Sequence, residues 1–395
     1  LTTINELSFH IAPAGLTRFL AFEFVPPPQT IYDEVQSLIP AHFMLVNGGR
    51  IVQERYWDLP YPNEQDSRSP TELEEELLGR LRLAVQRRMI SDVPLGVFLS
   101  GGLDSSIVTA LMAEVSSQPV ETFSIGFSEA SYDESRYARI VAKAFATNHH
   151  EEILEAETCA DLLPQIIQQM DVPMADASIA PTYLLSRLTR RSVTVALGGD
   201  GSDELWAGYE NYAAFRIALL YQKWPGLIRS CIEYLATFLP KSAGYVNLHL
   251  AMQTFLNGCR APDWLRIERL LCSFEEQGLQ TLLEPAFVEQ VPHILQREVL
   301  FNTTKMEFEH WQPQSVASPM ARAFHVYCRQ FLPEDILVKI DRASMLHSLE
   351  VRAPFLDRDL AEFTAKLPLR HKLSFLKGKW LLRRSMRHIL PRQIL

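Results

Sequence analysis

Residues 95–106 of the 395-residue chain read LGVFLSGGLDSS, and this stretch decides the fold class. Its first five residues form an apolar run that is typical of a strand buried on both faces of a parallel sheet. A serine and two glycines follow, and a helix is predicted over 105–115. The stretch therefore predicts a buried strand, a tight turn and a helix, which is the unit that doubly wound α/β sheets repeat.

The turn over residues 100–106 is suited to binding an anion. Gly101 and Gly102 let backbone N–H groups point outward, and the serines add hydroxyl donors at a helix N-terminus, where the helix dipole favours negative charge. The chain has no G-x-x-x-x-G-K-[ST] pattern, so a P-loop hydrolase is disfavoured. The alternative is an ordinary turn that uses serine as a helix cap. Asp104 weakens this alternative, because its carboxylate would repel phosphates unless a hard cation such as Mg²⁺ lay between them.

Strand and helix signals alternate on both sides of this turn. The predicted strands cover 95–99, 120–127 and 193–197. The predicted helices cover 105–115, 133–146, 159–170 and 178–191. Between about 209 and 345, apolar-periodic segments are long and β-rich runs are few, which predicts helices. We therefore expect an α/β fold with a doubly wound, mostly parallel sheet and an added helical subdomain.

A second glycine-rich turn, this one acidic, follows the predicted strand over 193–197. Residues 198–209 read GGDGSDELWAGY, with three glycines and three acids in the first seven positions. Because the carboxyl ends of parallel strands meet at one edge of a sheet, we expect Asp104 and Asp203 to face one crevice. Together with phosphate oxygens, these two carboxylates could hold Mg²⁺. The alternative is a solvated acidic turn that caps the following helix.

The two turns resemble those of the asparagine synthetases, a family within the ATP-pyrophosphatase (PP-loop) superfamily. SGGLDSS over residues 100–106 is similar to the pyrophosphate loop in the form that asparagine synthetases carry. The second turn matches the family pattern G-[ED]-G-x-D-E-x-[FW]-x-G-Y almost throughout, and further matches extend over most of residues 60–395. The resemblance implies an α/β fold of the adenine-nucleotide alpha-hydrolase type, ATP and Mg²⁺ as cofactors, and small-molecule substrates.

The resemblance also implies roles for individual side chains. The residues expected to bind ATP are Leu99, Ser100, Gly101, Gly102, Asp104, Ser105, Ser106, Ile125, Gly198 and Gly199. Asp104 and Asp203 are expected to hold Mg²⁺, and Asp200 is expected to assist formation of an adenylate.

Three charged residues further along the chain are candidate catalytic residues by the same resemblance. Asp341, Glu350 and Arg352 are the charged groups of a helix and turn that close the synthetase cleft in the family. An internal ion-pair network around Glu350 and Arg352 is an alternative of equal weight. In the family, an R-x-K-x-x-F segment follows the stretch that resembles residues 389–395, and its lysine contacts the adenylate and pyrophosphate. We therefore expect that lysine to lie outside these 395 residues.

Composition and resemblance together predict the domain organisation. Residues 59–70, which read LPYPNEQDSRSP, are polar and proline-bearing and are the best linker candidate. Residues 1–58 resemble only the tail of the family's N-terminal glutaminase domain, and residues 71–395 resemble its synthetase domain. Within the synthetase part, we expect an α/β core over 71–208 and a mainly helical part over 209–395.

The implied reaction is ATP-dependent amide formation through an acyl-adenylate. In the family, aspartate, ATP and ammonia typically give asparagine, AMP and pyrophosphate, and glutamine supplies the ammonia in glutamine-dependent members. Those members use an N-terminal cysteine as the nucleophile, and because the first cysteine here is Cys159, we expect no glutaminase activity from this stretch.

Three alternatives to this reaction have different sequence requirements. A relative that closes a lactam or amidates another carboxylate would share both turns and differ in the acceptor pocket. A superfamily member that acts on tRNA would need a basic face and usually working cysteines, which this composition does not supply. A non-catalytic partner protein would be expected to have lost acids from one turn, and here all are present.

Composition limits the partners and the compartment. The chain has 47 acidic and 38 basic residues, and its formal charge of −9 argues against nucleic acid as a partner. No apolar run approaches the ~18 residues that span a bilayer, so no membrane partner is expected. The five cysteines are never spaced as C-x-x-C, which favours a reducing cytoplasm over a disulfide framework. The resemblance leaves room for a homodimer.

Overall fold

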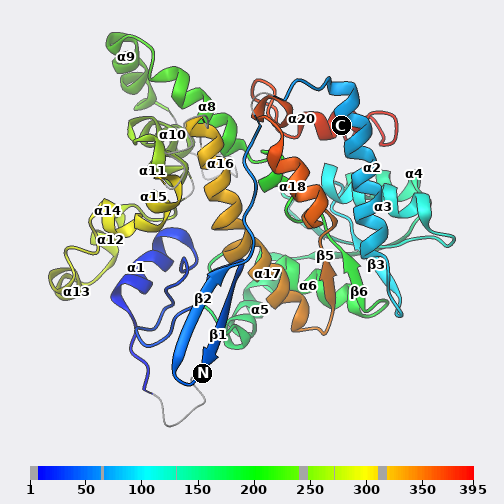
Figure 1. The fold of residues 1–395 in the computed structure, drawn as a ribbon, viewed down its shortest axis with the longest axis horizontal. Helices are drawn as coiled ribbons and strands as arrows, with labels where there is room; N and C mark the ends of the chain where they lie inside the picture. Colours follow the sequence, from blue (N-terminus) through cyan, green and yellow to red (C-terminus); the bar gives the residue numbers. More distant parts are fainter. Residues whose placement is uncertain (1–7, 64–65, 130, 240–247, 271, 310–317) are drawn as a thin grey trace. The chain divides into compact units, whose positions relative to one another are not determined.

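The computed structural model describes residues 8–63, 66–129, 131–239, 248–270, 272–309 and 318–395 (Figure 1). Internal contacts divide the chain into two units, and each unit is assembled from separate stretches of sequence. The α/β unit consists of Pro60–Asp171, Asp176–Tyr209 and Ile336–Leu395. The helical unit consists of Leu1–Leu59, Val172–Ala175 and Glu210–Asp335.

The sheet of the α/β unit has the strand order β5-β4-β3-β6-β7, and all neighbouring strands are parallel. The strands are β3 Leu95–Phe98, β4 Glu121–Phe127, β5 Asn148–Leu154, β6 Val195–Leu197 and β7 Glu350–Arg352. Val97 of the central strand β3 lies opposite Thr122 of β4 and Leu197 of β6. The chain adds strands first on one side of β3 and then on the other. The predicted parallel α/β sheet is confirmed, and its strand order reverses beside β3.

Two groups of helices pack around this sheet. The first group is α2 Pro70–Arg88, α3 Leu103–Val115, α4 Ser135–Ala144, α18 Arg358–Lys366 and α20 Trp380–Ser385. The second group is α5 Ala156–Gln169, α6 Ile179–Arg190 and α17 Leu337–Met345. The short helices of the unit are α7 Ser202–Leu205, the 3-10 turn η2 Pro354–Leu356 and α19 Leu369–Lys372.

Local sequence explains where α2 begins and which face it buries. The Ser69 hydroxyl accepts a hydrogen bond from the Glu72 N–H, and the Glu72 carboxylate accepts one from the Ser69 N–H. This reciprocal capping box satisfies N–H groups that a helix start leaves unpaired. Leu73, Leu77 and Leu81 recur at helical spacing and are fully buried, so the apolar stripe packs into the unit. A second apolar cluster forms between sheet and helices, and its buried members are Phe98, Phe123, Val193, Ala196 and Leu349.

The helical unit begins with α1 Pro13–Phe22 and an antiparallel hairpin of β1 His42–Asn47 and β2 Arg50–Arg55. Its other helices are α8 Glu210–Tyr221, α9 Gly226–Ala236, α10 Leu248–Arg260, α11 Asp263–Arg269, α12 Glu276–Leu282, α13 Pro285–Gln290, α14 Arg297–Leu300, α15 Asn302–Glu309 and α16 Pro319–Arg329. A π-helical turn, η1 Leu332–Ile336, directly precedes α17. The apolar core of this unit includes Phe22, Phe24, Leu265, Leu300 and Phe301.

The structure contains three elements that the sequence patterns do not predict. The stretch that forms α1 lies in a region expected to be strand and loop, yet Pro13 starts a helix that buries Ala21 and Phe22. Strand β5 reads NHHEEIL and lies at an edge of the sheet, so it lacks the apolar run of a central strand. Strand β7 is only three residues long, too short for a periodic signal.

The division into units also differs from the expected domain boundaries. The synthetase part was expected to be continuous over 71–395, but residues 210–335 group with the first 59 residues, and residues 336–395 return to the α/β unit. Long-range contacts decide this grouping, and hydrophobic periodicity carries no information about them. No helix in the described part of the chain is long and apolar enough to cross a membrane.

Candidate functional site

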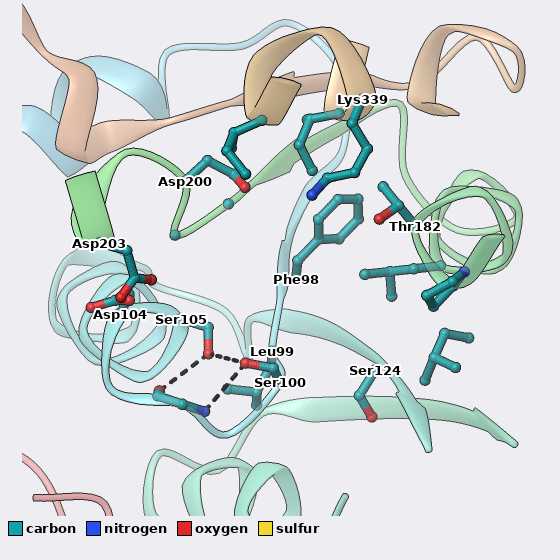
Figure 2. Close-up of a pocket in the computed structure, with 18 of the residues that line it drawn as sticks. Phe98, Leu99, Ser100, Asp104, Ser105, Ser124, Thr182, Asp200, Asp203 and Lys339 are labelled. Carbon is teal, nitrogen blue, oxygen red and sulfur yellow. Dashed lines mark hydrogen bonds between the residues drawn. The ribbon is translucent and has the colours of Figure 1, made fainter. Parts of the chain in front are cut away.

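A cavity of about 400 Å³ lies at the carboxyl edge of the sheet within the α/β unit (Figure 2). Its wall is formed by the residues after β3, the end of β4, the turn after β6, and the first turns of α6 and α17. Ligands of open α/β sheets bind at this edge, beside the point where the strand order reverses. The volume lies in the range of small-molecule sites.

The serine turn, residues 100–106, connects β3 to the N-terminus of α3. Gly101 has a φ of +87°, and a Cβ added there would lie 2.3 Å from the backbone nitrogen of Ala138. Only glycine fits this position without displacing the start of α4. The hydroxyl groups of Ser100 and Ser105 lie 3.0 Å apart at the start of α3 (Figure 2). The turn therefore presents hydroxyl groups at the positive end of a helix of 13 residues, which favours an anion.

The acidic turn, residues 198–209, follows β6 and is joined to the serine turn by a hydrogen bond. Ser202 Oγ donates to Asp104 Oδ1 at 2.8 Å. Figure 2 shows the side chains of Asp104 and Asp203 close to each other, as the sequence predicts for two acids at neighbouring strand ends. The two turns therefore place their carboxylates at the same end of the cavity.

Lys379 lies between these two carboxylates. Its Nζ is 2.5 Å from Asp104 Oδ2 and 2.6 Å from Asp203 Oδ1. Lys379 precedes α20 with a left-handed backbone conformation, φ +57°. A Cβ on Gly208 would lie 2.2 Å from Lys379 Cε. The lysine therefore reaches the carboxylates because the acidic turn carries no side chain at position 208.

The charges of this cluster largely compensate one another. Burial raises the pKa of Asp104 above its usual value, Lys379 opposes this rise, and Asp203 adds to it. Burial would lower the pKa of Lys379, but attraction to the two carboxylates outweighs burial and raises it. An ammonium group held between two carboxylates is thus stable in this buried position.

Asp104 and Asp203 also fit a magnesium ion by the chemistry of their oxygen donors. Mg²⁺ is commonly bound by one or two carboxylates together with substrate phosphates and water. Both carboxylates contact the same lysine nitrogen, so their oxygens are close enough to share one small cation. Within the described ranges, no group of three or more His, Cys, Asp or Glu side chains could hold a metal by itself. A metal at this place would therefore need phosphate oxygens or water to complete its coordination.

Two further carboxyl groups of the acidic turn line the cavity. Burial raises the pKa of Asp200, and the nearby Lys339 opposes this rise. Glu204 is 1 % exposed, and burial raises its pKa to about 7. The Tyr209 hydroxyl donates a hydrogen bond to Glu204 at 2.6 Å. These two carboxyl groups can therefore be neutral at a pH where ordinary carboxyl groups are ionised.

Lys339 extends into the cavity from α17, on the wall opposite the Asp104–Asp203 pair (Figure 2). It is 8 % exposed, and its Nζ donates a hydrogen bond to Asp176 Oδ2 at 2.6 Å. Burial would raise the pKa of Asp176, but the ammonium group outweighs burial and lowers it. Lys339 thus lines the cavity and is paired with Asp176, whereas Lys379 contacts the two carboxylates at the other end of the cavity.

A second cavity of about 220 Å³ shares Asp200 and Ile340 with the first. Asp341 and Glu350 line this second cavity. Asp341 pairs with the neighbouring Arg342 at 2.7 Å, and Glu350 pairs with Arg352 at 2.7 Å. Two of the expected catalytic acids therefore lie in the adjoining cavity rather than in the one that holds the two turns.

Arg352 lines neither cavity. Its guanidinium donates to the Glu350 carboxylate and to the backbone oxygens of Arg88 and Ile90, at 2.9 and 2.7 Å. These contacts match the internal ion-pair network that the sequence left open as an alternative. The catalytic role expected for Arg352 stays a prediction.

The structure brings most of the expected nucleotide and metal residues into one place. The expected site residues that line the first cavity are Leu99, Ser100, Gly102, Asp104, Ser105, Ile125, Gly198, Gly199, Asp200 and Asp203. Gly101 and Ser106 shape the serine turn instead, since Ser106 is fully buried and its hydroxyl donates to the Gly102 carbonyl at 2.6 Å.

The sequence analysis missed the two lysines. Lys379 contacts Asp104 and Asp203, and the lysine expected beyond residue 395 stays a prediction. The only local signal of Lys379 is the KGK segment over 377–379 before a short helix. Lys339 lies two residues before Asp341. Neither spacing nor composition distinguishes these lysines from surface lysines, because their partners are far away in the sequence.

Comparison with known proteins places this site in a family. Residues 76–395 match the family model described as asparagine synthase. The chain is 29 % identical over 396 residues to "Asparagine synthetase [glutamine-hydrolyzing] 1" of Bacillus subtilis, with 99 % of this chain and 59 % of that protein covered. It is 26 % identical over 384 residues to "Asparagine synthetase [glutamine-hydrolyzing] 3" of the same organism, covering 93 % of this chain and 54 % of the relative.

A relative with a different name is similar over much of the same region. "Amidase chyE" of Penicillium rubens is 25 % identical over 405 residues, with 91 % of this chain and 57 % of the relative covered. The chain spans little more than half the length of these three relatives. The family match over 320 residues, together with the two turns at the carboxyl edge, shows that the chain belongs to the asparagine synthase family.

Proposed function

We propose that the chain joins a carboxylate and ammonia into an amide, with ATP as co-substrate and an acyl-adenylate as intermediate. In its specific form, aspartate, ATP and ammonia give asparagine, AMP and pyrophosphate, and glutamine supplies the ammonia in the full-length protein. The observation that carries the proposal is the convergence of the serine turn, the acidic turn and Lys379 at one end of a cavity. The names of the relatives support the same reaction.

The serine turn suits the β- and γ-phosphates of ATP. The start of α3 offers backbone N–H groups, and Ser100 and Ser105 add hydroxyl groups. Lys379 adds a positive charge that can follow the negative charge of the departing pyrophosphate. Asp104 and Asp203 would hold Mg²⁺, which when bound neutralises phosphate oxygens and makes pyrophosphate a better leaving group.

Adenylate formation is then mainly an electrostatic problem. A carboxylate oxygen of the acceptor attacks the α-phosphorus, the bond from this phosphorus to pyrophosphate breaks, and its electron pair leaves with pyrophosphate. Both reacting groups are anionic, so holding them together lowers the barrier only where positive charge offsets their repulsion. Burial raises the pKa of Asp200, so this carboxyl can lie near the phosphate in its neutral form. Ammonia then attacks the acyl carbon and displaces AMP.

Amidation of another carboxylate is the second candidate function. Relatives named "Amidase chyE" and "Amidase chry2" are 25 % and 24 % identical to the chain. Their similarity to the chain supports an enzyme that uses the same adenylation site with a different acceptor. The two turns are equally compatible with a lactam-forming enzyme, because they would bind ATP and not the acceptor.

Exchange of labelled pyrophosphate into ATP tests the proposal directly, because it reports adenylation without ammonia. We expect exchange by the full-length natural protein that depends on both L-aspartate and Mg²⁺, and asparagine formation once ammonium is added. Exchange with other carboxylates but not with L-aspartate would favour the second candidate. ATP binding without exchange for any carboxylate would contradict adenylation altogether.

Two lysine variants test whether adenylation takes place at this site. Lys379→Met removes the charge between Asp104 and Asp203 and should reduce exchange by about 10²–10³. Lys377→Met is the matched control, because Lys377 is exposed and its Nζ lies 3.4 Å from the Leu395 carbonyl instead. Equal exchange rates in the two variants would place adenylation elsewhere.

A further inference from the structure

The main cavity is lined by several carboxyl groups, although the proposed function requires it to admit an anionic acceptor. Asp104, Asp200, Asp203 and Glu204 all contribute to its lining. Among the described residues of that lining, Lys339 carries the only ammonium or guanidinium group. A carboxylate that moves from water into this cavity loses hydration and comes near other carboxylates. It therefore needs a cationic partner there.

Lys339 is placed to be that partner. Its amino group extends from α17 into the cavity, between Asp200 and Thr182, on the wall across from the Asp104–Asp203 pair (Figure 2). An ammonium group has three N–H donors, and Asp176 accepts one of them at 2.6 Å. Because Lys339 also lines the cavity, its ammonium group can donate to a ligand there as well as to Asp176.

Asp176 is itself held by its neighbours, which fixes the lysine. The Asp176 Oδ1 atom accepts hydrogen bonds from the Ser178 N–H at 2.8 Å and from the Ser178 hydroxyl at 2.7 Å. Its other oxygen, Oδ2, accepts from Lys339. The ammonium position is thus set by a carboxylate that is anchored before the start of α6, and a fixed charge binds a ligand with less ordering cost than a free one.

We propose that Lys339 binds the acceptor's reacting carboxylate beside the α-phosphate. This inference rests on the proposed function and assigns one of its substrates to a wall of the cavity. With pyrophosphate at the serine turn, the α17 wall remains for the acceptor. There Lys339 offsets the negative charge of the carboxylate until one of its oxygens bonds to the α-phosphorus and pyrophosphate departs with the electron pair. Lys339 is a substrate-binding residue, and its contact weakens once the carboxylate becomes an ester-like acyl group.

The competing explanation is that Lys339 and Asp176 form a purely structural ion pair. Removing one member of a buried pair leaves the other charge unpaired and destabilises the fold. A single substitution therefore cannot separate the two explanations. Lys339→Gln, Asp176→Asn and the double substitution together can, because the double variant leaves two neutral amides and no unpaired charge.

The experiment measures labelled pyrophosphate exchange in the full-length natural protein and its three variants. L-aspartate, L-glutamate and β-alanine serve as acceptors, and the KM of any acceptor that supports exchange is determined. Calorimetry gives the Mg-ATP dissociation constant, and thermal unfolding gives Tm. We expect Lys339→Gln to raise the acceptor KM about 10–100-fold, the range for loss of one charge-assisted hydrogen bond, with Mg-ATP affinity within threefold of the parent.

The double variant decides between the two explanations. We expect its Tm to recover relative to the single variants while its acceptor KM stays raised, and Asp176→Asn to raise the acceptor KM less than Lys339→Gln does. A structural pair predicts instead that the acceptor KM recovers together with Tm. Unchanged acceptor KM in Lys339→Gln would also overturn the inference.

Failure of the proposed function has a different signature. In that case the parent protein would show no exchange with any of the three acceptors although Mg-ATP binds, and the inference would fall with it. Parental exchange combined with a normal acceptor KM in the variants would overturn the inference alone and leave the adenylation reaction standing.

Discussion

Individual charged residues determine the electrostatics of this site, and Lys379 is central because it contacts two carboxylates. It contacts Asp104 and Asp203 at 2.5 and 2.6 Å, so the two acids share one positive charge. Without it, the carboxylates of Asp104 and Asp203 would face each other with no positive charge between them and would repel each other. Lys379 already offsets part of the charge of Asp104 and Asp203. We therefore expect these acids to bind a second cation only when phosphate groups add further negative charge.

Two acids of the acidic turn should differ in what they do. Asp203→Asn removes a proposed metal ligand, so we expect weaker Mg-ATP affinity in calorimetry as well as slower pyrophosphate exchange. Asp200→Asn should leave Mg-ATP affinity nearly unchanged and reduce the exchange rate by about 10²–10³, as for other single groups that act in a transition state. Parental exchange by Asp200→Asn, together with normal Mg-ATP affinity in Asp203→Asn, would contradict both assignments.

At the scale of elements, the serine turn depends on one backbone conformation. Gly101 and Gly49 both have a positive φ, +87° and +81°. A Cβ on Gly101 would lie 2.3 Å from the Ala138 nitrogen, whereas a Cβ on Gly49 in the β1–β2 hairpin would meet nothing within 4 Å. A residue with a side chain would therefore meet the same backbone strain at either position, and only at Gly101 would it also meet a steric clash.

This pair makes a matched test of the turn. We expect Gly49→Ala to cost about 1–2 kcal/mol of unfolding free energy, from left-handed strain alone. Gly101→Ala should cost about 2–5 kcal/mol, because overpacking adds about 1–3 kcal/mol, and it should also weaken Mg-ATP binding. Urea unfolding and calorimetry measure both effects. Equal costs for the two substitutions would show that α4 yields easily and that the turn is not fixed by packing.

At the scale of the whole molecule, each unit contains a buried carboxyl group with a raised pKa. Burial raises the pKa of Glu204 in the α/β unit and of Glu268 in the helical unit to about 7. Thr304 donates a hydrogen bond to Glu268 at 2.8 Å. At these two positions the folded chain binds more protons than the unfolded chain between about pH 4.5 and 7, so their contribution to stability falls as the pH rises through this window.

Glu268→Gln tests this pH dependence. The rise from 4.5 to about 7 corresponds to about 3 kcal/mol of stability that Glu268 loses by pH 7 and above. Because glutamine does not ionise, thermal unfolding of the variant should change less between pH 5 and 8 than that of the parent. Glu298→Gln is the control, since Glu298 is exposed in α14. Parallel pH profiles for parent and Glu268→Gln would show that Glu268 is not ionising in this range.

The compartment and the assembly of the chain stay predictions at this scale. The expected cytoplasmic location, the absence of a nucleic-acid partner and the homodimer rest on composition and resemblance. The family assignment supports small-molecule substrates.

The sequence by itself determined the parallel sheet, the two turns and the family. An apolar run followed by glycine and serine is a local pattern, because the turn needs a left-handed residue at Gly101 and hydroxyl groups within seven positions. The same holds for the acidic turn after β6. The approach of Asp104 to Asp203 also follows from local patterns, since parallel strands deliver their carboxyl ends to one edge.

Only the tertiary structure decided which lysines pair with the acids of the site and how the chain divides into two units. Lys379 reaches Asp104 from 275 positions away, and Lys339 reaches Asp176 from 163 positions away. Such pairs leave no periodic signal, because a buried lysine and a solvated lysine look alike until their partners are known. The return of residues 336–395 to the α/β unit has the same origin, since long-range packing and not local propensity places β7 in the sheet and α17 and α20 in the same unit.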